Sequence, residues 1–323
     1  MSDHVIMSYA LNGPHRGQPL SGPDISRLVA AEDLAWVHMD ATHPETRIWI
    51  EENLPYLDRH ALDGMLADET RPRATQIGDG MLVILRGVNL NEGAEPEDMV
   101  SIRVWLDPHR VISVRKRRLR AVQDIEARIK EGTGPETAGG FLALLLERLT
   151  ARVEPVMRDL DDETDELEEN VVVEPDSDLR RPITEVRRRT IHLRRFLAPQ
   201  RAAAELIYDS TVSWLDDESR RRVSESQDKL TRTVEELDSI RDRATVVKDE
   251  LSSALSERLN RHLYILSLIS AVFLPLGFLT GLLGVNLGGI PGADRPYAFA
   301  VFTLMLLAVA AAILLILKKL RWL

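Results

Sequence analysis

The sequence predicts a mixed α/β domain followed by a long helical stalk and two C-terminal transmembrane helices. The first part of the chain alternates short β-branched runs with helical segments, whereas the chain after Lys116 keeps a helical periodicity. A run from about Asp216 contains neither Gly nor Pro until Pro275. Charged residues are almost confined to positions 1–262, so an acidic, water-facing region precedes a strongly apolar end.

The N-terminal region reads as strands and helices that alternate. Its β-branched runs predict strands at residues 5–9, 35–39, 81–90, 100–106 and 110–115. Helical patterns predict helices at residues 23–33, 44–53 and 56–67, the second of which opens on Pro44. Gly78-Asp79-Gly80 predicts a turn before the third strand. We therefore expect a sheet with helices packed on it.

The middle of the chain is predicted to be helical throughout. Residues 141–169 and 179–208 read as two long helices, which Pro175 and Asp176 separate. In the run from Asp216, apolar residues recur every seven positions, at Val223, Leu230, Leu237, Ala244 and Leu251, with Val234 and Leu255 at the intermediate spacing. This period is typical of a helix that packs along partner helices. Roughly sixty residues at about 1.5 Å each span on the order of 90 Å, which predicts a stalk.

Two apolar segments follow the stalk and predict a membrane hairpin. Residues 263–283 and 297–317 are each about the twenty residues that cross a hydrocarbon core. Arg258 and Arg261 precede the first segment, and Lys318, Lys319 and Arg321 follow the second. By the positive-inside rule both termini are cytoplasmic and residues 284–296 form a short external loop. No signal peptide is visible, and the lipid bilayer is an expected partner.

These elements divide the chain into seven segments. They are a cytoplasmic α/β domain (1–140), long cytoplasmic helices (141–215), a stalk helix (216–262), a first transmembrane helix (263–283), an external loop (284–296), a second transmembrane helix (297–317) and a basic cytoplasmic tail (318–323).

Composition and missing motifs exclude several classes of function. The chain has no cysteine, which removes disulfides, thiolate zinc sites and cysteine nucleophiles. Its net charge of -10 argues against nucleic acid as a partner and favours cations. It contains no Walker loop, dinucleotide fingerprint or nucleophile elbow, so we expect neither an enzyme nor a cofactor.

A pair of helices in lipid has no interior, so a transporter built this way needs several copies of the chain. Along the first segment, polar Asn260, Ser267 and Ser270 lie roughly on one helical face. The candidate pore-lining residues are Asn260, Leu263, Leu266, Ser267, Leu274, Gly277 and Gly281. Such a face suits the passage of a hydrated ion, and it equally suits ordinary helix packing, in which the Gly277–Gly281 spacing serves close contact.

The most specific local signal is Gly284-Val285-Asn286, directly after the first apolar segment, followed by LGGIPG. This stretch resembles the Gly-x-Asn signature of the CorA family of divalent-cation transporters, whose usual form is Gly-Met-Asn, so that Val285 departs from it. Residues 56–89 and the stretch LPLGFLTGLLGVNLGGIPG resemble the zinc-transporting ZntB branch of that family.

The resemblance implies a funnel-shaped homopentamer in the inner membrane, with the stalk helices lining the conduction path. In that family the signature Asn forms a ring at the external pore mouth. This role carries over to Asn286, whose amide oxygen would hold a metal ion through its hydration shell. Gly284 would permit the close backbone turn there. The implied cargo is zinc, with magnesium, cobalt, nickel and cadmium as further divalent candidates, and uptake coupled to protons.

Two other functions stay open from the sequence. One is a magnesium or cobalt channel of the same family, and the other is a non-conducting membrane-anchored scaffold or sensor that uses the stalk for assembly. Asp249, on the stalk near the membrane, is a second candidate metal contact. Residues 159–169 contain eight acids in eleven positions, which we interpret as a solvated helix or a local cation-attracting surface. The eight histidines are scattered and form no recognisable ligand motif.

Overall fold

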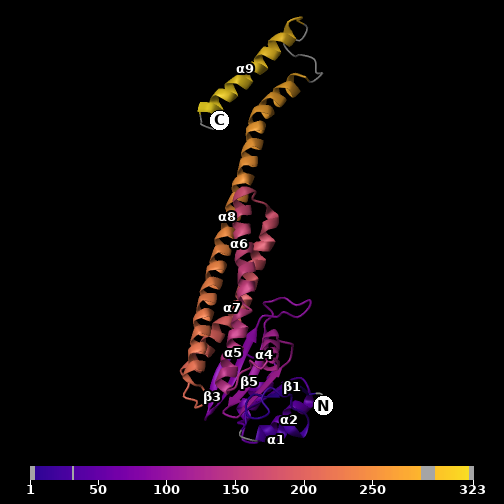
Figure 1. Ribbon diagram of the computed structural model, residues 1–323. Coiled ribbons are helices and arrows are strands. Elements are labelled where there is room, and N and C mark those ends of the chain that lie inside the picture. Colours follow the sequence, from indigo (N-terminus) through magenta and orange to yellow (C-terminus); the bar gives the residue numbers. More distant parts are fainter. Residues whose placement is uncertain (1–3, 31–32, 285–294, 320–323) are drawn as a thin grey trace. The chain divides into compact units, whose positions relative to one another are not determined.

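The computed structural model describes residues 4–30, 33–284 and 295–319. The chain forms two compact units, one of residues 1–174 and 178–249, the other of residues 175–177 and 250–323. Because their relative placement is not determined, the units are described separately (Figure 1).

The first unit is built on a six-stranded sheet in the order β1-β2-β6-β5-β4-β3. The strands are β1 (Val5–Ala10), β2 (Ala35–Asp40), β3 (Arg73–Ile77), β4 (Gly80–Gly87), β5 (Val100–Asp107) and β6 (Arg110–Arg115). Only β2 and β6 pair in parallel, with Val37 opposite Ile112. Every residue of β5 is buried, as expected of a strand covered on both faces.

Helices cover both faces of this sheet. On one face lie α1 (Pro23–Ala30), α2 (Pro44–Asn53) and α3 (Arg59–Leu66), whose Val29, Ile50 and Met65 join the sheet residues in one apolar core. On the other face, Phe141 packs on Trp36 of β2, with ring centroids 5.0 Å apart. Near that face, α4 (Arg120–Lys130) begins one residue after the buried Leu119. The predicted sheet with packed helices is therefore confirmed.

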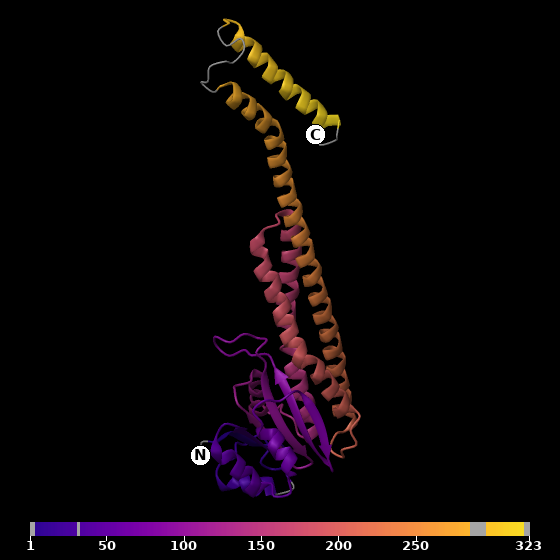
Figure 2. The ribbon, with the colours of Figure 1, turned by 180° about the vertical axis from the view of Figure 1, so that it is seen from behind.

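Four helices follow in the chain (Figures 1 and 2). They are α5 (Ala138–Ala151), α6 (Glu154–Val173), α7 (Arg180–Tyr208) and α8 (Asp217–Leu283), with a 3-10 turn at Ser177–Leu179 before α7. The last described helix is α9 (Ala298–Lys319). The long uninterrupted helix from about Asp216 is confirmed, since α8 has 67 residues.

Two predictions about local structure were wrong. Residues 141–169 do not form one helix, because the chain turns at Arg152 and Val153 before α6. Pro155 lies in the first turn of α6, where its missing N–H costs nothing and its fixed φ favours a new helix start. The edge strand β3 was missed, because its mostly exposed side chains give no apolar alternation.

The heptad face of α8 is buried within the first unit. Val223, Leu230 and Leu237 are fully buried and Ala244 nearly so. The helices beside them belong to the same chain, because ion pairs join α8 to α5, α6 and α7. The predicted packing along partner helices is thus satisfied inside one chain. The division into seven segments stays a prediction.

Candidate conduction path

The predicted pore-lining residues all lie on α8, and all are exposed in the single chain. Leu263 is 51 % exposed and Leu274 is 73 % exposed. Asn260, Ser267, Gly277 and Gly281 are exposed as well. Successive members are three or four residues apart, so they follow one face of the helix; Leu266 stands at its edge. We call the residues Asn260, Leu263, Ser267, Ser270, Leu274, Gly277 and Gly281 the α8 stripe.

Nothing in the described part of the chain covers this stripe at its glycines. A Cβ atom added to Gly277 or Gly281 would meet no atom within 4 Å. The most apolar 18-residue stretch of α8 contains no buried residue. Among the described residues, the glycine pair therefore makes no close contact with another helix of the same chain.

The end of α8 has a tight backbone, and Gly284 lies at this point. Its N–H donates to the carbonyl of Thr280 at 2.8 Å. A Cβ atom on Gly284 would stand only 2.7 Å from that same carbonyl oxygen, closer than real Cβ contacts allow. This explains physically why glycine occupies the position. Val285 and Asn286, the other two signature residues, lie outside the described residues.

Proline and threonine adjust the last turns of α8. Pro275 lies inside the helix and has no N–H to donate to the carbonyl one turn earlier. In both views, α8 is bent near its C-terminal end (Figures 1 and 2). Thr280 Oγ1 donates to the carbonyls of Leu276 and Gly277, at 3.0 and 2.9 Å, so its hydroxyl is satisfied without water. Such internal satisfaction is what a helix in lipid requires.

The second apolar helix, α9, is also long enough to cross a membrane. Of its most apolar 18 residues, 6 % are buried. Lys318 and Lys319 lie in its last turn, where cations complement the helix dipole and mark a membrane boundary. The described chain thus has two candidate transmembrane helices.

The acidic run on α6 is part of an ion-pair network within the first unit. Arg243 of α8 donates to Asp161 at 2.8 Å and to Glu168 at 2.8 Å, and it also contacts Asp165. The hydrogen bonds with Glu168 raise the pKa of the Arg243 guanidinium, although partial burial opposes the shift. Glu163 pairs with Arg189 of α7 at 2.6 Å. These carboxylates hold helices together, which favours the structural interpretation of the run.

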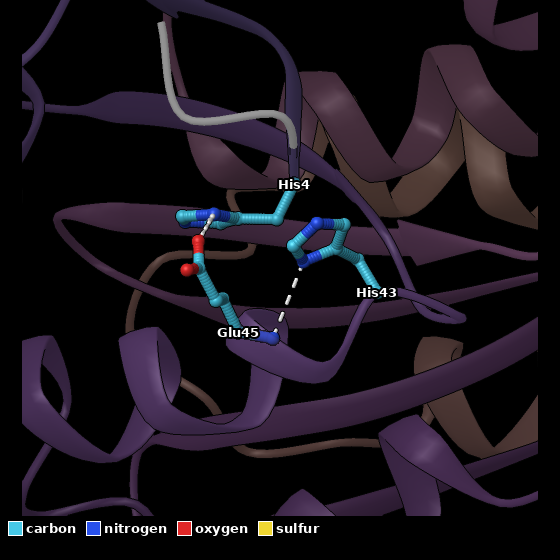
Figure 3. A group of neighbouring side chains, drawn as sticks. All are labelled: His4, His43 and Glu45. Carbon is cyan, nitrogen blue, oxygen red and sulfur yellow. Dashed lines mark hydrogen bonds and ion pairs between the residues drawn. The ribbon is translucent and has the colours of Figure 1, made fainter.

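One cluster escaped the sequence analysis. His4, directly before β1, lies next to His43 and Glu45, at the start of α2 (Figure 3). The residues are far apart in the chain and match no ligand motif, so only the fold brings them together. Asp249 is exposed on α8, in the first unit, and belongs to no such group among the described residues.

The chain is similar to known membrane transporters over nearly its whole length. A family described as "CorA-like Mg2+ transporter protein" matches residues 31–319. Zinc transport protein ZntB of Yersinia enterocolitica is 36 % identical over 319 residues, which cover 99 % of this chain and 96 % of that protein. Divalent cation transporter CmaX of Pseudomonas aeruginosa is 40 % identical over 324 residues, covering 99 % of this chain and 97 % of that protein.

Solved structures agree with this relationship. The full-length CmaX structure superposes with a TM-score of 0.85 at 39 % identity, covering 100 % of this chain and 99 % of that one. The CorA magnesium transporter from Methanocaldococcus jannaschii gives a TM-score of 0.78 at 16 % identity over 100 % of both chains, which shows a shared fold. By sequence and by fold, the chain belongs to the CorA family and is a divalent-cation transporter rather than an enzyme.

Proposed function

We propose that this transporter carries zinc across the inner membrane as a homopentamer, with the α8 stripe facing the five-fold axis. The single observation that carries the proposal is the stripe itself. It is exposed along the apolar part of α8, it carries three polar side chains on an otherwise apolar face, and nothing in the described chain covers its glycines.

The physical argument for an oligomer starts from backbone hydrogen bonding in lipid. Each apolar helix satisfies its own N–H and C=O groups, but two helices enclose no water-filled space. A cyclic assembly repeats one helix around an axis and so builds a passage from a single face. The stripe supplies such a face, and Gly277 and Gly281 allow neighbouring backbones to approach closely.

The chemistry of the stripe suits transient contact with a hydrated cation. Asn260, Ser267 and Ser270 offer neutral oxygens that accept hydrogen bonds from the ion's water shell. Leu263 lies between Asn260 and Ser267, and Leu274 follows Ser270. Neither leucine offers a ligand that would trap an ion. In this proposal Asn286 forms the external ring, with Gly284 and Val285 shaping its backbone. Asp249 is the proposed cytoplasmic-side contact.

Zinc is the preferred cargo because of the relatives and because of Val285. The relative at 36 % identity is named a zinc transport protein, and the one at 40 % is named a divalent cation transporter. Val285 stands where magnesium-transporting members of the family usually carry Met, which favours zinc over magnesium or cobalt. Nickel and cadmium are the other divalent ions to be tried.

The charged residues around the two apolar segments, and their absence within them, bear on the membrane orientation of the chain and on its coupling to protons. We infer that both termini lie in the cytoplasm, because basic residues flank the two apolar segments there: Arg258 and Arg261 before the first, Lys318 and Lys319 after the second. Residues 263–283 and 297–317 contain no carboxylate or histidine. If uptake is driven by protons, the groups that carry them therefore lie outside these segments.

The test is flux in liposomes. We expect purified protein to pass zinc faster than magnesium or cobalt, and to pass it faster with an inward proton gradient. Asn286→Ala is expected to change zinc flux or the zinc-to-magnesium ratio while native mass spectrometry still gives five copies. Asn170→Ala, an exposed amide on α6, is the matched control.

Unaltered flux in Asn286→Ala overturns the pore-mouth role. Faster magnesium than zinc overturns the choice of cargo, and a strictly monomeric protein overturns the whole proposal.

A further inference from the structure

A buried imidazole without hydrogen bonds lies at the start of the sheet. His4 directly precedes β1, and only 4 % of its surface is exposed. Neither of its ring nitrogens has a hydrogen-bond partner among the described residues. Buried polar atoms are nearly always paired, because an unpaired one forfeits its contacts with water. A buried ring whose nitrogens make no hydrogen bond has the chemistry of a metal ligand.

Two further ligand groups point toward this ring from the next layer. Glu45 lies in the first turn of α2, and its Oε2 is 3.2 Å from His4 Nδ1. The two atoms form an ion pair when His4 is protonated, without a hydrogen bond between them. The His43 ring stands beside them, with its centroid 5.8 Å from that of His4 (Figure 3). One potential ligand atom from each of the three residues lies within 4.8 Å of the others.

The fold positions these side chains through the pairing of β1 with β2. Val5 is opposite Met39, so His4 is carried to the end of β2, and the N–H of Asp40 donates to the carbonyl of His4 at 2.9 Å. The chain then turns directly into α2, with His43 as its N-cap. Both halves of the cluster are thus fixed by backbone structure.

The spacing suits a tetrahedral metal ion. Zinc binds histidine nitrogen and carboxylate oxygen at about 2.0–2.2 Å, so two such ligands at a tetrahedral angle are about 3.3–3.5 Å apart. The His4–Glu45 pair, at 3.2 Å, is close to that spacing already. The third ligand, His43, must move by a side-chain rotation. Glu45 is 61 % exposed, which leaves room for solvent as a fourth ligand.

We propose that His4, His43 and Glu45 form a binding site for a divalent transition-metal ion of the zinc class on the soluble unit. Two imidazoles and one carboxylate favour zinc, cobalt or nickel over magnesium and calcium, which prefer oxygen ligands alone. The site uses none of the residues of the α8 stripe, and it does not rest on zinc being the transported ion.

The local hydrogen bond of His43 limits the affinity. His43 Nδ1 accepts from the backbone N–H of Glu45 at 3.2 Å and so caps α2. Coordination through Nδ1 would release this cap, and coordination through Nε2 would displace the proton that the neutral ring carries there. The bound ion would therefore tie the start of β1 to the start of α2 at some cost to the helix terminus.

The experiment measures binding to the purified full-length protein, without transport. We expect cobalt(II) to give the intense visible absorption of a four-coordinate site, and zinc to displace it. Loss of a single second-shell partner costs about 10–100-fold in metal affinity, so removal of a ligand should cost at least about 10-fold. The variants are Glu45→Gln and His43→Asn, the latter because Asn also caps helices. Glu52→Gln, an exposed acid on the same helix, is the control.

Each outcome decides the proposal. Loss of the cobalt absorption and of one metal equivalent per chain in both variants, but not in the control, supports the site. An unchanged spectrum and stoichiometry in Glu45→Gln and His43→Asn overturns it. If Glu45→Gln only lowers the unfolding temperature without metal, His4 and Glu45 are a simple ion pair and the site is rejected. A failure of zinc flux would leave these binding results unaffected, so the two proposals can fail separately.

Discussion

Arg243 on α8 and Glu168 on α6 form a two-pronged ion pair, with Nε 2.8 Å from Oε1 and Nη2 3.0 Å from Oε2. The same guanidinium also reaches Asp161 and Asp165, so one cation lies among three carboxylates of the acidic run. Planar arginine matches a carboxylate in this fork geometry, which lysine does not. The pairing explains how a helix so rich in acids packs beside α8 within the first unit.

Arg243→Met is therefore expected to destabilise the first unit. It removes the attraction and leaves three neighbouring carboxylates to repel one another. Because all the partners are partly exposed, we expect a loss of about 1 kcal/mol, near the upper end for such pairs. The loss should shrink in 1 M salt, where the screening length falls to about 3 Å. The measurement is thermal unfolding of the full chain at low and high salt.

The matched control is Arg232→Met, at an exposed arginine of α8 for which no carboxylate partner is found among the described residues. It removes the same charge without touching the network. An equal loss of stability in both variants would contradict the role given to Arg243.

Protonation of His38 is expected to make the protein sensitive to acid. His38 on β2 is fully buried, and its ring nitrogen Nδ1 lies 2.7 Å from Ser113 Oγ. Burial, with a smaller contribution from Arg115, lowers the pKa of His38 from 6.5 to about 3. Between these two pH values the unfolded chain binds a proton that the folded chain does not. The contribution of the neutral His38 ring to the free energy of unfolding is therefore complete above pH 6.5 and is lost as the pH falls toward 3.

His38→Asn tests this relation, because Asn keeps a polar group near Ser113 but does not titrate. For each proton that the unfolded chain binds and the folded chain does not, the free energy of unfolding changes by about 1.4 kcal/mol per pH unit. We expect the slope of unfolding free energy against pH, between 6.5 and 4, to be smaller in the variant by about 1 kcal/mol per pH unit. His15→Asn, at an exposed histidine, should leave the slope unchanged. Equal slopes in His38→Asn and the parent would refute the buried neutral histidine.

Local pattern was enough to predict most of the fold. Alternation found the strands that become β1, β2, β4, β5 and β6, and the heptad predicted the buried face of α8. Pattern failed where the chain gives no periodic signal. The edge strand β3 exposes most of its side chains, and neither Arg152 nor Val153 is a Gly or Pro that would mark the turn. Pro155, in the first turn of α6, is the signal that was missed.

Of the candidate sites, the sequence predicted the residues of the α8 stripe but not the histidine cluster. The spacing of three and four residues predicted that the α8 stripe lies on one helical face, because that period belongs to one helix; its role in conduction stays a prediction. The cluster of His4, His43 and Glu45 was not predictable, because it depends on the register of β1 against β2. Contacts between copies of the chain lie beyond any single-chain pattern, and this is why the function of the stripe has to be tested in the assembly.

Enlarging Gly281 is expected to weaken that assembly. In the single chain an added side chain meets nothing within 4 Å, and Gly281→Leu should even favour the helix. If neighbouring subunits pack against this position, the larger side chain forces them apart at a cost of about 1–3 kcal/mol per contact. Native mass spectrometry should then show fewer intact oligomers. Thr280→Leu, next to it but on another helical face, should assemble normally; loss of assembly in both variants, or in neither, would argue against a specific contact at Gly281.

Because the chain has no cysteine, introduced cysteines can show directly which side of α8 is accessible to water. A single cysteine introduced at any position is the only thiol present, so labelling has no background. Ser267→Cys is nearly isosteric and lies on the stripe, whereas Ile269→Cys lies two residues on, about 200° around the helix. Both positions are exposed in the single chain, so any difference between them comes from assembly or lipid.

A thiol reacts through its thiolate, which needs water. We therefore expect a charged methanethiosulfonate reagent to label Ser267→Cys and to lower its zinc flux, measured on the same liposomes before and after labelling. Ile269→Cys, and Ile265→Cys on the same side, should stay unlabelled because lipid or neighbouring helices surround them. Asn260→Cys extends the test toward the N-terminal end of the stripe. The opposite pattern, with the isoleucine positions reactive and Ser267→Cys inert, would turn the stripe away from water and remove it from the conduction path.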